Sequence, residues 1–265
     1  MAHESGKNGG VYSNSLLIED CEDAWTVDNV TTCNTDADAK VGAASVKNVI
    51  PGALGANILL SHEGSLTLDL TTYDMVILWI KSSITAAAND NQILLDDTDA
   101  CTSAIEFLQL PALTLGVWTQ VGLLLATPAS DGSIVAVGLK QIAALGARDI
   151  FLDDIRAVQE IDGIKSWNLD SVANTLDVTD FDDAGIKTFL PGCTEWSGSF
   201  EGYKEGIPLS IGAEVYLVLG ETSIAGQAWL GKAIITAAHP TTSHDGIVSY
   251  GYDYQGTGAL TSPSI

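Results

Sequence analysis

Two segments near the end of the chain alternate between apolar or small residues and polar residues. Between positions 194 and 203, the even positions hold Trp196, Gly198 and Phe200, whereas glutamate and serine fill the odd positions from 195 to 201. Between 247 and 254, one valine and three tyrosines share the even positions. Because successive side chains of a strand point to opposite faces, a period of two predicts strands with one buried face. We therefore expect strands over residues 195–203 and 247–254.

The first part of the chain, residues 15–158, contains many short apolar or alternating segments separated by Gly, Asn, Asp and Pro. This punctuation predicts a series of short strands joined by turns. The expected strands cover residues 15–19, 44–50, 65–70, 74–81, 92–95, 117–124, 133–139 and 149–157. We therefore expect an all-β chain, with a β-sandwich or jelly roll in this part.

Short motifs follow one another in a fixed order over residues 161–260. They are Gly163-Ile164-Lys165-Ser166-Trp167, Asp177-Val178-Thr179 with Phe181 and Gly185, Phe189-Leu190-Pro191-Gly192, Trp196-Ser197-Gly198-Ser199-Phe200-Glu201-Gly202, Gly231-Lys232-Ala233-Ile234-Ile235 and Gln255-Gly256-Thr257-Gly258. This ordered set resembles the tail tube proteins (major tail proteins) of long-tailed bacteriophages, and residues 6–12 resemble that family's opening strand. The resemblance implies a small β-sandwich that forms hexameric rings, which stack into a tube through which DNA passes.

The family pattern is interrupted after the opening strand, because about 145 residues intervene before the Lys-Ser-Trp motif, which is the size of a domain. We expect residues 1–14 and 159–265 to form a tail-tube-type β-sandwich, and residues 15–158 to form an inserted jelly-roll domain. The runs 73–83, 117–121 and 150–156 resemble carbohydrate-binding modules of the galactose-binding-like type. In that fold the first and last strands lie side by side, so the module can be spliced into a loop of its host.

The resemblance also implies where copies of the chain contact one another. The polar loop over residues 180–193 would be an arm that reaches an adjacent subunit, and the open edges of the alternating strands would be satisfied by closure of a ring. The inserted domain would project outward, since it could not fit in a lumen that passes DNA. The expected contact residues are Asp180, Phe181, Phe189, Leu190, Trp196, Phe200, Tyr250 and Tyr252.

The chain is strongly acidic, with 34 acidic and 11 basic residues and a formal net charge of −23. The excess is spread evenly, since residues 1–158 hold 20 acidic and 7 basic residues, and residues 159–265 hold 14 and 4. This argues against direct nucleic-acid binding, which needs Lys and Arg to neutralise phosphates. On the wall of a tube the same charge would keep DNA from adhering as it passes. Solubility of the protein is the alternative explanation.

Acidic residues near both ends of the inserted part are expected to converge if its first and last strands are neighbours. The set comprises Glu19, Asp20, Glu22, Asp23, Asp153 and Asp154. A hard cation with oxygen ligands, namely calcium, would relieve their repulsion, with Asp20, Glu22 and Asp153 as ligands. The alternative is that these are solvated turn residues. The cysteines are expected to be reduced, with a Cys21–Cys33 bridge as the alternative.

Candidate platforms for sugar binding are few. Trp79 and Trp118 lie within apolar segments and are expected in the core, while Trp25, Tyr73 and Phe107 are ambiguous. Any binding of host-surface glycans by the inserted part is therefore expected to be weak, with avidity supplied by many copies on one particle.

The sequence contains no nucleophile elbow, phosphate loop, dinucleotide-binding turn or zinc-protease motif, so we expect no enzyme activity and no required cofactor. The longest apolar runs are far shorter than a bilayer span, so we expect no membrane insertion. The expected location is the virion, after assembly in the host cytoplasm. Two alternatives remain open: a capsid decoration or adhesion protein, and a glycan-binding module or fragment of a polysaccharide-degrading enzyme. Trimers or monomers would favour the first, and high affinity for a glycan would favour the second.

Overall fold

The structure is a computed structural model. It describes residues 10–180, 186–205, 208–221, 228–242, 244 and 246–263. The expected contact residue Phe181 and the motif residue Gly185 lie outside the described residues, as do residues 6–9 of the expected opening strand.

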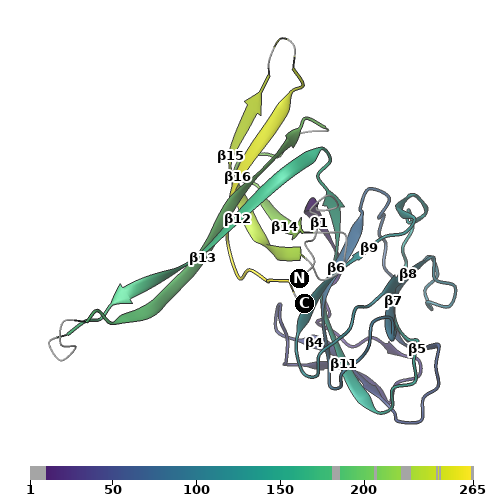
Figure 1. The fold of residues 1–265 in the computed structure, drawn as a ribbon. Helices are drawn as coiled ribbons and strands as arrows, with labels where there is room; N and C mark the ends of the chain where they lie inside the picture. Colours follow the sequence, from purple (N-terminus) through teal and green to yellow (C-terminus); the bar gives the residue numbers. More distant parts are fainter. Residues whose placement is uncertain are drawn as a thin grey trace.

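The described chain is built from strands, with one short 3-10 turn at Pro128–Ser130 (Figure 1). The prediction of an all-β chain is therefore confirmed. The strands are β1 (Val11–Glu19), β2 (Thr26–Val27), β3 (Thr32–Asp36), β4 (Ser45–Ile50), β5 (Ile58–Glu63), β6 (Met75–Ser82), β7 (Asn91–Asp96), β8 (Glu106–Gln109), β9 (Thr119–Leu124), β10 (Ala136–Gln141), β11 (Arg148–Glu160), β12 (Ile164–Asp177), β13 (Phe189–Tyr203), β14 (Glu214–Gly220), β15 (Ala228–Thr241) and β16 (Ser249–Gly256).

The strands form two antiparallel sheets. The smaller sheet has the order β2-β5-β10-β7-β8. The larger has the order β12-β13-β16-β15-β14-β1-β11-β4-β3, and β6 joins it by pairing with β11 and with β9. One predicted strand is absent from both sheets: within residues 65–70 the structure has only an isolated bridge between Leu68 and Ile134.

The first core lies between the smaller sheet and the β3-β4-β11-β6-β9 part of the larger one. Val76, Leu78 and Ile80 alternate inward along β6, and Ile93 and Leu95 do so from β7 in the facing sheet. Full burial of one such side chain stabilises the fold by about 1.5–3 kcal/mol. Two facing antiparallel sheets around one core form a β-sandwich, as the sequence predicts for this part.

A second core lies in the curve of the β12-β13-β16-β15-β14 segment. It joins Trp196 and Phe200 of β13 to Leu217 and Leu219 of β14. The sheet curls far enough for the indole Nε1 of Trp167, on β12, to donate a hydrogen bond of 3.3 Å to the carbonyl oxygen at the end of β14. Since β12 and β14 turn their inner faces to the same core, their outer faces point away from each other.

The two bodies meet along β1, which pairs with β11 on one side and with β14 on the other. The expected neighbourhood of the inserted part's first and last strands is therefore observed. A small apolar cluster that includes Ile77, Val158 and Tyr216 seals the junction, and Gln120 donates a hydrogen bond to the Tyr216 hydroxyl. The boundaries predicted after residues 14 and 158 fall inside β1 and β11. The division into residues 1–14 plus 159–265 and residues 15–158 stays a prediction.

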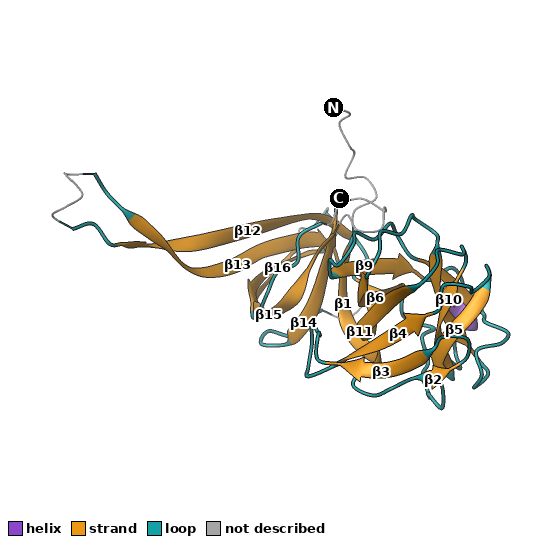
Figure 2. Cartoon of the chain, turned by 90° about the horizontal axis from the view of Figure 1, so that it is seen from below, coloured by secondary structure: helices purple, strands orange, loops and turns teal. Residues whose placement is uncertain are grey.

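The β12–β13 hairpin extends well beyond the body of the molecule (Figures 1 and 2). Strand β16 pairs with β13 only from Ser197 to Tyr203, so residues 172–180 and 186–195 form a ribbon that has no third strand among the described residues. We call this ribbon the arm. The loop predicted over residues 180–193 is shorter than expected, because β13 begins at Phe189 and is held in register by β12.

Candidate functional site

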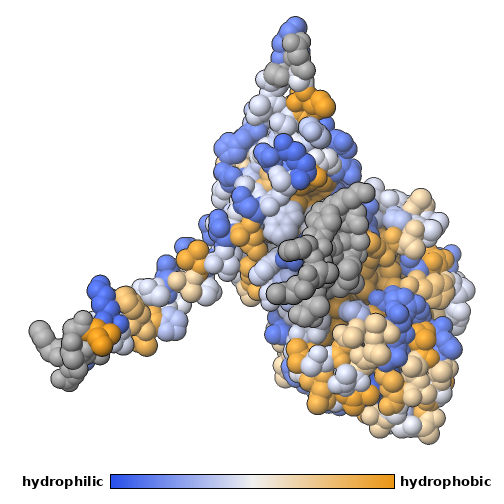
Figure 3. Space-filling view, viewed as in Figure 1, coloured by the Kyte–Doolittle hydropathy of each residue, from blue (hydrophilic) through white to orange (hydrophobic). Residues whose placement is uncertain are grey.

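The arm exposes large apolar side chains. Val172, Leu176, Phe189 and Leu190 are each about half exposed, at 51%, 58%, 49% and 53%. Leu176 and Leu190 lie directly opposite each other on the two strands. Apolar side chains are visible close to the distal end in Figure 3. A two-stranded ribbon is at best marginally stable in water, so contact of this apolar surface with another surface would stabilise it.

The distal end of the arm is fixed by its own polar contacts. The amide of Val178 donates to the carbonyl oxygen of Thr188 at 3.0 Å. Hydrogen bonds from Thr179, and then the contact with Lys187, lower the pKa of Asp177. The Lys187 ammonium lies 3.3 Å from the Asp177 carboxylate and 5.8 Å from the centre of the Phe189 ring. The tip therefore presents a cation beside an exposed aromatic side chain.

Two strand edges of the arm-bearing segment lack a full partner. Among the described residues, no strand pairs with the outer edge of β12, and β1 with the preceding Gly10 covers β14 only from Val218 to Gly220. These edges lie at opposite ends of the strand order β12-β13-β16-β15-β14. Open backbone edges are templates for pairing with another chain, and head-to-tail pairing of two different edges generates either a closed ring or an open filament.

The outer face of β12, β13 and β16 is acidic. Asp170, Glu195 and Glu201 are exposed on it, and Asp253 is half-buried. Glu201 has an ion pair of 3.3 Å with Lys165, and Asp253 contacts His239 at 3.0 Å. This face points away from the outer face of β14, where the Tyr216 cluster joins the other body.

Three of the predicted contact residues are not surface residues. Trp196, Phe200 and Tyr252 are at most 5% exposed, because their side chains form the second core of their own chain. The alternating pattern therefore reflects burial of these side chains within one chain. The prediction that the three side chains contact a second copy is wrong. Tyr250 is half-buried and stacks on Tyr252. Of the remaining predicted contacts, Asp180, Phe189 and Leu190 are exposed on the arm.

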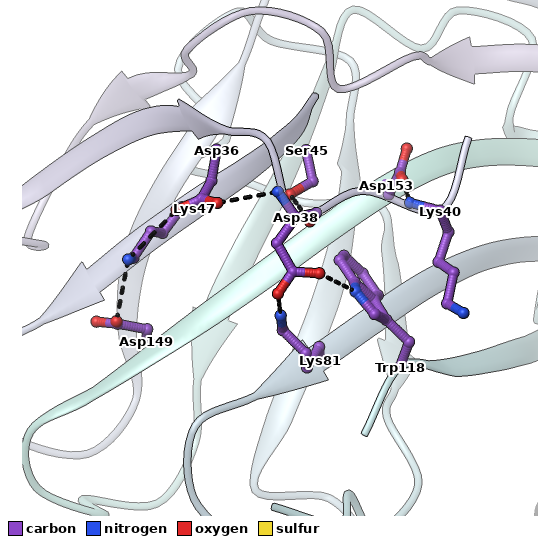
Figure 4. Close-up of polar contacts among 9 residues, drawn as sticks. All are labelled: Asp36, Asp38, Lys40, Ser45, Lys47, Lys81, Trp118, Asp149 and Asp153. Carbon is purple, nitrogen blue, oxygen red and sulfur yellow. Dashed lines mark hydrogen bonds and ion pairs between the residues drawn. The ribbon is translucent and has the colours of Figure 1, made fainter. Parts of the chain in front are cut away.

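The predicted calcium ligands accept hydrogen bonds from backbone amides of their own chain. The carboxylate of Asp153 is fully buried and accepts a hydrogen bond of 2.6 Å from the amide of Lys40 (Figure 4). It accepts another, of 2.9 Å, from the amide of Val41. Glu22 accepts a bond of 2.8 Å from the next part of the loop after β3, and Asp20 accepts one from the Glu22 amide. Burial raises the pKa of Asp153, although the two amides lower it. In the described part of the chain, no group of three or more His, Cys, Asp or Glu side chains is placed to hold a metal ion. Calcium binding stays a prediction.

Trp79 and Trp118 lie on the outer face of the sheet, not in the core as predicted. The Trp118 indole donates a hydrogen bond of 2.8 Å to Asp38, which also accepts one from Lys81 (Figure 4). The Lys81 ammonium lies 4.0 Å from the centre of the Phe151 ring. The loop after β3 thus covers these aromatic side chains, and neither tryptophan is an open platform.

The sequence left open whether Phe107 is buried or exposed. In the structure its side chain is exposed, at 52%. It borders an open groove on the smaller sheet, whose polar wall includes Asn57, Thr102 and Lys140. Along β8, Glu106 and Leu108 are buried, whereas Phe107 and Gln109 are exposed. This alternation is the sequence signal that could have predicted the exposure of Phe107.

All four cysteines are free within the described residues, and only Cys193, on the arm, is exposed. No bridge joins Cys21 and Cys33. In the part of the chain that the structure describes, no helix has the length and apolar character needed to cross a membrane.

The chain is thus an all-β protein in which a β-sandwich is joined through one strand to a curled sheet with a projecting arm. No family model matches it, and no curated protein does. It is similar to a chain in the virion of a native gene transfer agent particle, with 21% identity over 41% of this chain and 89% of that one, at a TM-score of 0.33.

Two further solved structures are similar. A chain in the tail of an empty gene transfer agent particle, with C6 symmetry, has 22% identity over 40% of this chain and 87% of that one, at a TM-score of 0.32. A family 30 carbohydrate-binding module has 13% identity over 65% of this chain and 96% of that one, at a TM-score of 0.36. With TM-scores this low, the likenesses carry no argument about function.

Proposed function

We propose that this chain is a structural virion protein of a tailed bacteriophage, which forms hexameric rings that stack into a tail tube. The observation that carries the proposal is the arm, an exposed apolar ribbon that extends from the sheet with no third strand beside it in the described part of its own chain. A protein that acted as a single copy would gain nothing from such a ribbon, whereas a second copy can cover it.

The open edges of β12 and β14 support ring formation in this proposal. Pairing of β12 of one copy with β14 of the next would extend the sheet from subunit to subunit, and closure of the ring would cover these two edges. The contact is head-to-tail, as a ring requires. The number six comes from the resemblance to tail tube proteins.

The proposed orientation puts the acidic face of β12, β13 and β16 toward the lumen. The β-sandwich formed by residues 15–158 would then lie outside, because it is attached to the opposite face, on β14. Acidic side chains repel phosphates over about 8 Å at physiological salt, so DNA would pass without specific binding. In this proposal the chain performs no catalysis and needs no cofactor, and its partners are its own copies and other virion proteins.

Electron microscopy of the purified protein over a range of concentrations tests the proposal. We expect rings, and tubes with lateral knobs, at high concentration. A variant with Leu176→Asp and Leu190→Asp should form fewer assemblies, because it would place charges in the covered surface. Thr102→Asp, an exposed change on the β-sandwich, is the matched control and should assemble normally. Discrete trimers or monomers under every condition would instead favour a capsid decoration protein.

A second function, weak binding of glycans, is favoured by the exposed ring of Phe107 beside a polar-walled groove. Aromatic faces commonly stack on apolar faces of ligands, and neighbouring polar groups fix orientation. A glycan array probed with assembled particles and with single copies tests it. We expect signal from particles only, and loss of that signal in Phe107→Ala. Equal signal from this variant would rule out the groove.

A further inference from the structure

The groove beside Phe107 lies on the outer face of the smaller sheet. Leu94 and Phe107, which line it, are directly opposite each other on β7 and β8, and Lys140 of β10 lines it as well. The groove is open to solvent and holds about 670 Å³, within the range of about 300–1,000 Å³ typical of ligand pockets. We call it the Phe107 groove.

The loop of residues 97–105 contributes part of the lining and is held by a buried carboxylate. Asp96 is fully buried and accepts hydrogen bonds of 2.8 Å and 2.7 Å from the amide and the hydroxyl of Thr98. It accepts another, of 2.8 Å, from the amide of Ser103, a lining residue. Cys101 of the same loop is buried and packs in a small cluster with Leu94. This part of the groove is therefore preformed, so a ligand does not have to order it.

The groove offers a cation beside an aromatic ring. Among the described residues that line it, Lys140 is the only charged one, although the chain has 34 acidic and 11 basic residues. Its ammonium lies 6.0 Å from the centre of the Phe107 ring, and no carboxylate in the described part of the chain forms an ion pair with it. The thiol of Cys101 is neutral, because burial, and then the charges of Asp96 and Asp28, raise its pKa to about 12.

We propose that the Phe107 groove binds a saccharide that contains uronic acid units, that is, sugar units with a carboxylate group. This inference rests on the proposed glycan binding and names the class of sugar. The Phe107 ring packs against the C–H face of one sugar unit. Lys140 donates a charge-assisted hydrogen bond to the carboxylate, and such bonds are about twice as strong as neutral ones. The exposed side chains of Asn57, Thr102 and Ser103 pair with sugar hydroxyl groups.

Charge distinguishes this class of ligand from two others. A neutral sugar can use the Phe107 ring but leaves the Lys140 ammonium without a partner, so it binds less tightly than the acidic sugar. A densely charged polymer such as a nucleic acid is repelled by the net charge of −23 and meets only one cation in the groove. A polysaccharide with one carboxylate per acidic unit fits the single lysine.

Saturation-transfer NMR with the full chain tests the inference, since it detects weak binding by single copies. The probes are oligogalacturonate, oligomannuronate and a hyaluronan fragment. Each is compared with its carboxyl-reduced form, which keeps the linkages and loses the charge. We expect the acidic form to bind about tenfold more tightly than the reduced form.

Substitutions at the groove separate the contributions of charge and ring. Lys140→Met should remove the preference for the acidic form, Lys140→Arg should keep it, and Phe107→Ala should weaken binding of both forms. Lys204→Met is the matched control, because Lys204 is exposed and also lies 6.0 Å from the centre of an aromatic ring, that of Tyr250. This control should bind like the unmodified chain.

The outcomes distinguish the class of sugar from glycan binding itself. Equal affinity for the acidic and reduced forms, or a preference that survives in Lys140→Met, would overturn the inference and leave the proposed glycan binding intact. Absence of binding to every form, together with a glycan array without signal, would overturn both. Phe107 is exposed and Lys140 is half-buried, so we expect both variants to fold like the unmodified chain.

Discussion

At the scale of single residues, the sequence pattern reports packing more than contacts between copies. The motif Trp196-Ser197-Gly198 shows why. The Trp196 indole lies where a Cβ atom at Gly256 would approach it to 2.1 Å, and where one at Gly231 would approach to 2.6 Å. Its Nε1 donates a hydrogen bond of 2.9 Å to the carbonyl oxygen of Gly258. Because Gly231 of β15 and Gly256 of β16 have no side chain, they leave the space that the Trp196 indole fills.

We expect Gly256→Ala to destabilise the fold, because the new methyl group would overlap the indole. Overpacking of this kind costs about 1–3 kcal/mol. Gly258→Ala is the matched control, since a methyl group there would meet no described atom within 4 Å beyond its chain neighbours, and its effect should stay within about 0.5 kcal/mol. Urea unfolding followed by tryptophan fluorescence measures both, and equal stability of the two variants would contradict the packing argument.

Asp131 should make stability depend on pH. Burial, and then the charge of Glu106, raise its pKa from 3.8 to about 6, and neither carboxylate oxygen has a hydrogen-bond partner among the described residues. A raised pKa means that folding favours the protonated form. The contribution of this group is therefore fully present below about pH 4 and is lost as the pH rises through about 6.

Asp131→Asn removes this titration, because the amide stays neutral. Near pH 8 the free energy of unfolding of the variant should exceed that of the unmodified chain by up to about 3 kcal/mol. This difference should shrink toward pH 4. Thermal unfolding across this range gives the difference directly. A gain that is the same at both ends of the range would mean that Asp131 does not titrate there.

At the scale of elements, the sequence predicts strands where burial imposes alternation. Strand β6, expected over residues 74–81, spans Met75–Ser82. Strand β16, expected over 247–254, spans Ser249–Gly256. The distal halves of β12 and β13 escape prediction, because both faces are exposed and the register comes from the partner strand alone. The short strands β2 and β3 carry too few apolar residues to stand out.

The arm should exchange its amide hydrogens much faster than the β-sandwich in single copies. Its amides belong to a ribbon that no other described strand supports, whereas β7 is buried along its whole length. Local opening with little loss of buried contacts has a low free energy. Hydrogen exchange followed by mass spectrometry should show protection of residues 172–180 and 186–195 only after assembly. Rates for β7 should stay unchanged, and an arm already protected in single copies would refute the expectation.

At the scale of the whole molecule, charge opposes assembly while apolar surfaces favour it. Each copy carries a net charge of −23. Copies brought together repel one another, and salt screens this repulsion, since the Debye length falls from about 10 Å at 0.1 M to about 3 Å at 1 M. The sequence alone gives this net charge, but the acidic face opposite the attached β-sandwich becomes apparent only from the curl of the sheet.

Raising the salt concentration should therefore lower the protein concentration at which rings and tubes form. Sedimentation of assemblies at about 0.05 M and about 0.5 M NaCl compares the two conditions, and we expect a several-fold difference. Lys187→Glu, which adds negative charge at the arm tip, should steepen the dependence. Assembly that weakens as salt rises would mean that ion pairs between copies outweigh the repulsion.

Strand β1 links the two bodies without a hinge. It is hydrogen-bonded to β11 of the β-sandwich and to β14 of the curled sheet, and the Tyr216 cluster packs beside it. A load applied to the β-sandwich is therefore carried by the short β1–β14 pairing and by the Tyr216 cluster beside it. These contacts give the β-sandwich one orientation relative to the curled sheet. In a regular assembly, the β-sandwich of every copy would have the same orientation and a constant spacing. A surface that the particle approaches would therefore meet a regular array of identical β-sandwich faces.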